Sequence, residues 1–272
     1  MSTAAAVQEA TLGDLVRYWR KMRAMSQLDL AVAASTTPRY MSFVETGRSQ
    51  PSREMVLRLA SALDVPLRDR NGLLVAAGYA PVYPERDLDD PAIEHVMSAL
   101  ERMLDHHAPY PAIVMNRQWD VVRANPGATR LFAALCAPDP VPEPANVLRL
   151  MLEPGPVRTS VQNWTHVAHS LLERAQREAV GGVMDLETAE LVQQLRTTAD
   201  PALLTAPRSI APIVPVIDVE FAVSGIVLRW FSVVSTIGTP IDVTAQELRV
   251  EAFFPADEET ARRWRNLSAS HS

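Results

Sequence analysis

Helix start and stop signals follow one another closely through the first 80 residues, and this punctuation restricts the possible folds more than any other feature. Four segments begin after a serine or threonine N-cap, and in the first two an aspartate three residues later completes a capping box. These N-caps are Thr11, Ser26, Thr37 and Ser52. Gly47 and Gly78 mark helix ends. The signals predict helices over residues 12–22, 27–34, 38–46, 53–63 and 67–77. Helices of about eight to eleven residues are marginal alone, so we expect them to share one core.

The second and third of these helices are patterned to pack across a short turn. Leu30, Ala34, Met41 and Val44 are spaced to face inward from two crossing helices, and the small Ala31 allows them to approach closely. The third helix begins with a proline at its first position, where a missing N–H costs nothing. Its N-terminus carries free amides and a positive dipole.

Four short motifs in this stretch stand at a characteristic spacing. They are Ser26-Gln27, Leu30-Ala31, Glu45-x-Gly47 and Pro51-Ser52. With them the chain resembles the XRE/lambda-repressor-like helix-turn-helix family over about residues 12–78. The family usually has glycine at the interhelical turn, where this chain has Ser35; a left-handed conformation there costs serine about 1–2 kcal/mol. The resemblance implies an all-α domain whose third helix enters the major groove of DNA.

The resemblance also implies which residues contact DNA. They are Gln27, Thr37, Pro38, Arg39, Ser42, Phe43, Arg48 and Arg53. Gln27 and nearby amides would hold a phosphate, and Arg39 would read guanine O6 and N7. Ser42 and Phe43 would meet a base edge and a thymine methyl, and the two later arginines would grip phosphates. Two other interpretations stay open: the arginines are solvated surface charges with Phe43 buried, or the helix-turn-helix binds only protein.

Charge is divided unevenly along the chain. The whole chain has 26 Lys+Arg and 32 Asp+Glu, a net charge of -6, which by itself argues against a surface coated with nucleic-acid-binding charge. Residues 1–80, however, have a net charge of +3, and residues 81–272 have a net charge of -9. The change falls at the proline-punctuated Ala80–Pro84. We therefore expect a DNA-binding domain over 1–80 and a second domain over 81–272.

Composition excludes several other classes of protein. A hydrophobic content of 47% and a charged content of 21% exclude a mostly disordered chain. Cys136 is the single cysteine, so neither an intrachain disulfide nor a Cys-based zinc site can form. The first 25 residues lack the apolar region of a signal peptide, and no apolar run approaches a membrane span. We expect a cytoplasmic protein with no membrane partner, metal or cofactor.

The second region mixes helix and strand patterns. Helices are predicted from 91 to about 106, over 126–135 and over 161–180. Strands are predicted over 112–115 and 119–123, and a hairpin over 214–222 and 226–235 turns at Ser224-Gly225. Thr244 and Glu247 form a capping box that predicts a helix to about residue 253. The expected fold is an all-α lambda-repressor-like helix-turn-helix domain followed by an α+β domain.

Residues 112–125 give a strand, a tight turn, a strand and a helix-capping asparagine, and so look like the opening of a PAS-like sensor domain. Further segments at 37–47, 77–81, 146–150, 163–164 and 238–244 resemble the MmyB family of bacterial regulators. This resemblance runs from about residue 12 to 262. It implies a PAS-like ligand-binding domain, a small hydrophobic, fatty-acid-like effector, and a homodimer on a DNA operator with half-sites about 34 Å apart.

Large side chains of the second domain are candidates for the effector site, although such residues more often form core. The expected ligand-binding residues are Trp119, Phe132, Arg149, Leu150, Asn163, Trp164, Trp230 and Phe253. Arg149 alternates with Leu148 and Leu150, so one interpretation is an inward-pointing guanidinium that meets a carboxylate head group. An exposed strand or loop arginine is the alternative. Asn163 is equally placed to cap the long helix.

Signals for catalysis are weak. The sequence contains no Gly-rich phosphate loop and no nucleophile elbow, and His166 and His169 fall on a face that we expect to be solvated. The leading hypothesis is a ligand-responsive, sequence-specific transcription regulator and not an enzyme. Two alternatives stay open: an enzyme with a regulatory helix-turn-helix, and a constitutive repressor whose second domain only dimerises.

Overall fold

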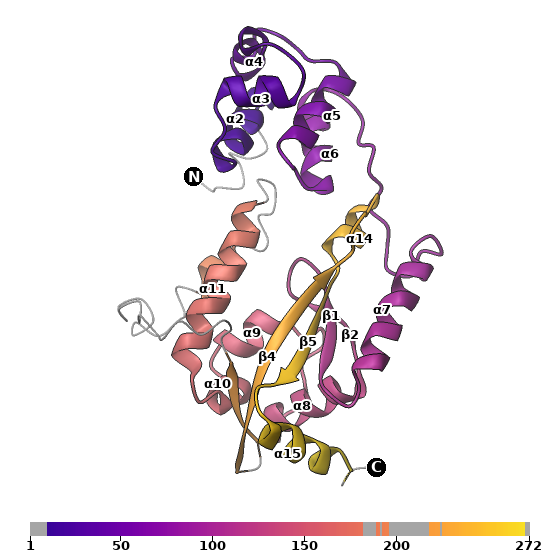
Figure 1. The fold of residues 1–272 in the computed structure, drawn as a ribbon, viewed down its shortest axis with the longest axis vertical. Coiled ribbons are helices and arrows are strands. Elements are labelled where there is room, and N and C mark those ends of the chain that lie inside the picture. The colour runs from indigo at the N-terminus through magenta and orange to yellow at the C-terminus, as the bar shows by residue number, and fades with distance from the viewer. Residues whose placement is uncertain (1–9, 182–188, 191, 196–217, 224, 270–272) are drawn as a thin grey trace. The chain divides into compact units, whose positions relative to one another are not determined.

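Figure 1 shows the computed structural model, which describes residues 10–181, 189–190, 192–195, 218–223 and 225–269. The described residues divide into two compact units. The N-terminal unit consists of the described parts of Met1–Arg86, Arg177–Leu186 and Thr239–Gln246, and the second unit consists of the rest. Thr239–Gln246 is therefore a short segment of the N-terminal unit that the chain inserts between two strands of the second.

The N-terminal unit is built from short helices delimited by their caps. Their bounds are α2 (Leu12–Met22), α3 (Gln27–Ala33), α4 (Pro38–Glu45), α5 (Arg53–Ala62) and α6 (Leu67–Ala76). The side chains of Thr11, Ser26, Thr37 and Ser52 each accept an N–H from the first turn. The predicted ranges are confirmed to within one residue because the signals that define them act locally.

These helices share one core, as expected for helices too short to be stable alone. Trp19, Leu30 and Met41 are among its fully buried side chains. At Gly13, a Cβ atom would lie 2.7 Å from the carbonyl oxygen of Glu45, so glycine allows α2 to lie directly against the end of α4. Ser35 has φ +53°, which confirms a left-handed serine at the interhelical turn.

The described residues of the second unit form a five-stranded antiparallel sheet with the order β2-β1-β5-β4-β3. The strands are β1 (Ala112–Met115), β2 (Val121–Ala124), β3 (Val219–Val223), β4 (Ile226–Thr236) and β5 (Arg249–Pro255). The helices are α7 (Glu94–His107), α8 (Pro126–Cys136), α9 (Val147–Leu152), α10 (Pro156–Ser160), α11 (Trp164–Gly181, of which residues 177–181 are counted with the N-terminal unit) and α15 (Glu258–Ala269). The predicted fold class, an all-α domain followed by an α+β domain, is confirmed.

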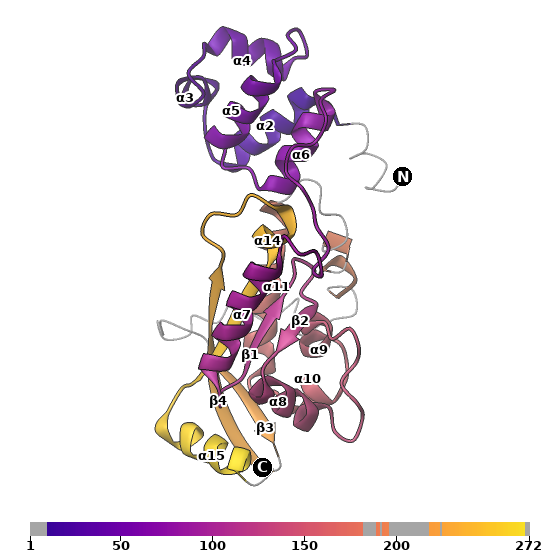
Figure 2. The ribbon, with the colours of Figure 1, turned by 90° about the vertical axis from the view of Figure 1, so that its right-hand side faces the viewer.

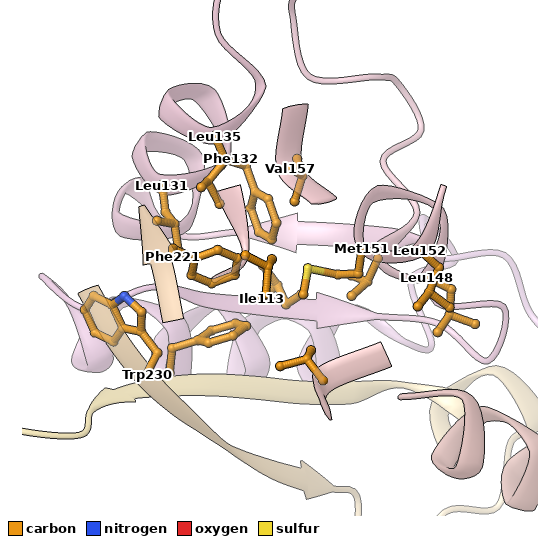
Figure 3. Packing of buried hydrophobic residues seen from close by; sticks show 14 of the residues in the cluster. Ile113, Leu131, Phe132, Leu135, Leu148, Met151, Leu152, Val157, Phe221 and Trp230 are labelled. Atoms are coloured by element: carbon orange, nitrogen blue, oxygen red, sulfur yellow. The ribbon is translucent and has the colours of Figure 1, made fainter. Parts of the chain in front are cut away.

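Both faces of this sheet are covered, and α7 and α11 lie on opposite sides of it (Figure 1). Ala112 and Val114 of β1 pack with α7, whereas Ile113 and Met115 belong to the larger cluster on the other face. Figure 3 shows Ile113 among side chains from α8, α9, β3 and β4. Helix α15 lies beside the sheet (Figure 2). Its Trp264 ring meets the Trp230 ring of β4 edge-on, with centroids 5.4 Å apart.

The central strand corrects one prediction. The pattern at Thr244 and Glu247 predicts a helix to about residue 253, but α14 (Val243–Glu247) is short and β5 follows it. Asp242 caps α14, since the Ala245 N–H donates to Asp242 Oδ1 over 3.1 Å. β5 pairs with β1 along one edge and with β4 along the other. Pairing on both edges outweighs a local helix signal.

The other differences between the predicted and the observed helices and strands are smaller. Residues 147–152 form helix α9, not the strand or loop that the alternation around Arg149 suggests, because the Asn146 side chain accepts the Arg149 N–H and starts a helix. The long helix begins at Trp164, later than predicted, and α15 was not predicted. The hairpin is present as β3 and β4, and residues 214–217 lie outside the described residues. Of the helices that the structure describes, none has both the length and the apolar character to cross a bilayer.

Candidate functional site

Helix α4 has one buried face and one face open to solvent. Its Met41 and Val44 are buried in the core. Thr37 Oγ1 accepts the Tyr40 N–H over 3.2 Å and fixes the start of the helix, where Pro38 is the first residue. The open face carries the predicted contact residues, of which Thr37, Pro38 and Arg39 are exposed and Ser42 and Phe43 are half-buried.

Arg39 and Phe43 form a stacked pair along this open face. The Arg39 Cζ lies 5.5 Å from the centroid of the Phe43 ring, one helical turn away. A cation–π contact at an exposed site contributes about 0.5–1 kcal/mol. The stack orders the guanidinium on the surface of α4 while leaving its N–H groups available to acceptors.

Two further arginines follow the helix. Gly47 has φ +71°, and the Arg48 N–H then donates to the Phe43 carbonyl over 2.8 Å, which turns the chain away from α4. Arg53 is the first residue of α5. Both side chains are exposed. Within the described part of the chain, no carboxylate pairs with Arg39, Arg48 or Arg53, so the surface around α4 carries uncompensated positive charge.

Behind this surface lies a buried carboxylate, Glu45, whose residue is only 4% exposed. Arg20 Nε lies 2.6 Å from Glu45 Oε1, and Gln27 Nε2 donates to Glu45 Oε2 over 2.9 Å. The Arg17 guanidinium also donates to the Glu45 carbonyl oxygen. Burial raises the pKa of the Glu45 carboxyl, but the hydrogen bonds from Arg20 and Gln27 and the two arginine charges outweigh it, so the pKa lies below its usual value.

This network changes the interpretation of Gln27. The family resemblance implies that Gln27 and nearby amides hold a phosphate, but in the structure the Gln27 side-chain amide donates to Glu45 and joins the start of α3 to the end of α4. Glu45 and Arg20 were missed as positioning residues. The signal was present, since Glu45 lies four residues after the inward-facing Met41 and so falls at a core position of the helix.

A pocket of about 330 Å³ opens beside α9 in the second unit. Its walls include Pro140, Pro142 and Pro144 from the loop between α8 and α9, together with Leu150 and Val157. Burial, with a smaller effect of a nearby aspartate, raises the pKa of the Cys136 thiol, so this lining group is neutral. The pocket is therefore largely apolar, with charged groups among its lining residues.

The pocket includes two of the predicted ligand-binding residues, Arg149 and Leu150. Of the two orientations that the sequence leaves open for Arg149, the structure shows the exposed one. Its side chain is 49% exposed and pairs with Glu153 one turn along α9, with Nη1 2.8 Å from Oε1. Because successive helical residues are about 100° apart, Leu148 is buried while Arg149 faces solvent.

Four other predicted residues belong to the core. Trp119 and Trp230 are fully buried and Phe132 and Phe253 are 8% exposed, all in one cluster, and none of them lines the pocket beside α9. Trp119 has φ +69°, and its ring lies 4.5 Å from Arg174 Cζ and 4.9 Å from Arg249 Cζ. The indole N–H groups of Trp119 and Trp230 have no acceptor among the described residues.

Asn163 and Trp164 fix the start of α11. Asn163 Nδ2 donates to the Asp218 carbonyl over 2.7 Å, and Asn163 Oδ1 accepts the Glu220 N–H over 3.1 Å, so this side chain holds β3. Trp164 Nε1 donates to the Met151 carbonyl, and the Arg158 guanidinium lies 3.7 Å from the Trp164 ring centroid. Across the described residues, His, Cys, Asp and Glu side chains do not gather in groups of three that could hold a metal ion.

Comparison with known proteins identifies both units by sequence. The family model for the MmyB-like transcription regulator ligand binding domain matches residues 96–267, and a helix-turn-helix model matches residues 16–69. No curated protein matches the chain. A solved structure of an RNA-binding light-oxygen-voltage receptor has 12% sequence identity and a TM-score of 0.27, which is too low to indicate a shared fold. That alignment covers 99% of this chain and 66% of the receptor, so the chain spans just under two thirds of the receptor's length.

Proposed function

The chain belongs to the MmyB-like transcription regulators, DNA-binding proteins with a ligand-binding domain, and on this premise we propose that it is a sequence-specific regulator that responds to a small hydrophobic effector and acts as a homodimer. In this proposal α4 is the recognition helix and the second unit, a PAS-like domain, receives the effector. The chain catalyses no reaction and works in the cytoplasm.

The observation that carries the proposal is the uncompensated positive surface around α4. Arg39, ordered by its stack on Phe43, presents a forked guanidinium that matches guanine O6 and N7. Arg48 and Arg53 flank the helix at positions suited to phosphates. Basic side chains beside one exposed helix, in a chain that is acidic overall, are the electrostatic pattern of a DNA contact.

The remaining contact residues have supporting roles. Ser42 and Phe43 lie on the same open face and reach a base edge and a thymine methyl. Thr37 and Pro38 form the positive end of α4, which favours a nearby phosphate. Gln27 acts indirectly: its bond to Glu45 holds the N-terminus of α3, and the free amides there bind the backbone.

For the effector we propose the pocket beside α9. Its volume of about 330 Å³ is at the lower end of the range for small-molecule sites, and its proline and leucine walls suit an apolar body. A fatty-acid carboxylate would compete with Glu153 for Arg149, because a carboxylate on either side satisfies the same guanidinium. The strand–turn–strand order of β1 and β2, followed by the Asn125 cap of α8, supports the PAS-like assignment.

The proposed mechanism is a shift between two dimer arrangements. The effector favours one arrangement and changes the separation of the two α4 helices, which must reach half-sites about 34 Å apart. Because the first 80 residues carry a net charge of only +3, one copy alone should hold DNA weakly. Two linked copies and base-specific contacts supply the affinity.

Selection of duplexes from a random-sequence pool by the full-length protein tests the DNA-binding assignment. The selected duplex should bind at least about 10³-fold more tightly than a scrambled duplex of the same composition. Equal affinity for the two duplexes would contradict the proposal. Native mass spectrometry of freshly purified protein tests the rest, since it should show two copies and the added mass of a small ligand.

A further inference from the structure

We propose that the connection between β4 and β5, residues 239–246, couples the ligand-binding sheet to the DNA-binding helices by capping helix α6. This inference rests on the proposed function and adds the route by which one unit regulates the other. The connection joins two strands of the sheet in sequence, yet it is part of the N-terminal unit. Its contacts with residues 66–86 are the basis of the inference.

The first contact replaces a missing helix cap. The N-cap position of α6 is Pro66, whose side chain makes no capping hydrogen bond. The first N–H groups of a helix lack partners within it, and an acceptor must come from elsewhere. Here Gln246 Oε1 accepts the N–H of Leu67 over 2.6 Å, from a residue 179 positions away in the chain. The start of α6 therefore depends on where Gln246 is held.

The second contact is an ion pair at the base of the connection. Asp242 Oδ2 lies 2.8 Å from Arg86 Nη1, and the Asp242 side chain is only 8% exposed. The other carboxylate oxygen, Oδ1, caps α14 by accepting the Ala245 N–H. One side chain thus sets both the direction of α14, which carries Gln246, and its attachment to residue 86.

Backbone hydrogen bonds complete the attachment. The Val243 N–H donates to the Pro84 carbonyl over 2.8 Å, and Thr244 Oγ1 donates to the Arg86 carbonyl over 2.7 Å. These two bonds come from the two residues that follow Asp242, and with the Asp242 ion pair they tie the connection to residues 84–86, so it moves together with the segment that follows α6.

The chain enters the sheet immediately after this attachment. Glu247, the residue after Gln246, pairs with Arg117 of the β1–β2 turn over 3.1 Å, and both side chains are largely buried. Arg249 Nη2 donates to the Asn116 carbonyl over 2.9 Å. Gln246 and Glu247 are consecutive residues, and their side chains are anchored in different units. In this proposal a displacement of the β1–β2 turn or of β5 reaches Gln246, and so the start of α6, through the peptide bond between them.

On the DNA side, the path from α6 to the recognition helix is short. Helix α6 packs against α2 and α5, and α2 packs against α4. The contact between α2 and α4 is close, since Gly13 leaves no room for a side chain there. Packed helices shift as units and not by gradual deformation, so loss or gain of the α6 cap biases how α4 is held.

Hydrogen exchange of the full-length protein tests the coupling without knowledge of the effector. Thermodynamic coupling is reciprocal, so DNA bound at α4 must alter the sheet if the sheet alters DNA binding. With the selected duplex at saturation, amide exchange in β4 and β5 of the wild-type protein should change by at least about fivefold. In Asp242→Asn, which keeps the cap of α14 but loses the charge, and in Gln246→Ala, this change should be lost.

Two matched variants separate coupling from general damage. The first is Asp257→Asn. Like Asp242, Asp257 caps a helix, by accepting the Thr260 N–H, and pairs with an arginine, Arg229. Unlike Asp242, it makes both contacts within the second unit. Gln246→Glu keeps an acceptor for the Leu67 N–H. Both variants should show the wild-type response.

The outcomes are distinguishable. If the duplex binds and β4 and β5 do not respond in the wild-type protein, or respond equally in Asp242→Asn and Gln246→Ala, the coupling role is overturned while the proposed function stands. If no duplex binds better than a scrambled one, the proposed function fails and the coupling proposal fails with it.

Discussion

Arg20 and Glu45 form a two-pronged ion pair, with Arg20 Nε 2.6 Å from Glu45 Oε1 and Arg20 Nη2 3.0 Å from Glu45 Oε2. The pair joins α2 to the last residue of α4, directly behind the surface proposed to read DNA. A planar guanidinium that meets a carboxylate in this way fixes orientation as well as distance. Helix α4 is therefore held at its C-terminal end by this ion pair and at its N-terminal end by the Thr37 cap.

Removing the charge of Glu45 should destabilise the N-terminal unit. Glu45→Gln leaves Arg20 without its carboxylate in a partly buried site, and loss of one partner of a buried pair costs about 3 kcal/mol. Native-state hydrogen exchange of α2 and α4 amides should show this loss of protection. Glu54→Gln, an exposed residue of α5, is the control and should leave the exchange unchanged.

The stability contributed by Glu45 should depend on pH in one direction. Its pKa in the folded protein lies below the usual value, so its contribution is complete above about pH 4.3, the ordinary pKa of glutamate, and is lost as the pH falls through the folded pKa. The difference in unfolding free energy between the wild-type protein and Glu45→Gln should therefore shrink on acidification. A difference that stays constant from pH 7 to pH 3 would show that the Glu45 charge does not stabilise the fold.

Two arginines near α4 should have separable effects on DNA. Arg39→Ala should weaken the selected duplex by about 1–3 kcal/mol and relax preference at one base position, because a base contact is lost. Arg48→Ala should weaken all duplexes similarly and lower the slope of log affinity against log salt by about 1, because one phosphate contact is lost. Binding titrations at several salt concentrations measure both effects. Arg262→Ala, an exposed site on α15, is the control.

The ion pair at the pocket should control carboxylate binding. Arg149→Gln should weaken binding of decanoate by about tenfold, as expected for loss of a charged hydrogen bond, with little effect on decanol. Glu153→Gln removes the carboxylate that occupies Arg149 and should strengthen decanoate binding. Calorimetric titration of the full-length protein distinguishes these signs. Equal binding of decanoate by the wild-type protein and both variants would place the effector elsewhere.

The helices of the first 80 residues could be predicted closely because a serine or threonine cap and a glycine stop act within one helical turn. The capping box at Thr244 and Glu247 was as clear a local signal, yet residues 249–255 form the central strand. The partners of that strand lie on β1 and β4, and no local pattern reports a pairing with a segment more than a hundred residues away.

For the candidate site, the sequence predicted the exposed arginines correctly but misassigned several polar and aromatic residues. Arg39, Arg48 and Arg53 are exposed, as expected. The Gln27 side chain, in contrast, donates to Glu45, because a buried carboxylate needs hydrogen-bond donors from its neighbours. Among the expected ligand contacts, Trp119 and Trp230 are buried in the core, since size and polarity alone do not separate core from pocket lining. The pocket is walled by the prolines of the loop between α8 and α9, and no pattern within that loop indicates that it lies beside α9.

The affinity of the selected duplex for ligand-free and ligand-saturated protein tests the central claim most directly. The ligand for this titration is the compound that native mass spectrometry identifies in freshly purified protein. A ligand-responsive regulator should change its duplex affinity by at least about fivefold on saturation, and the duplex should change the ligand affinity by the same factor. Equal duplex affinities in the two states would contradict the claim that this protein transmits ligand binding to DNA.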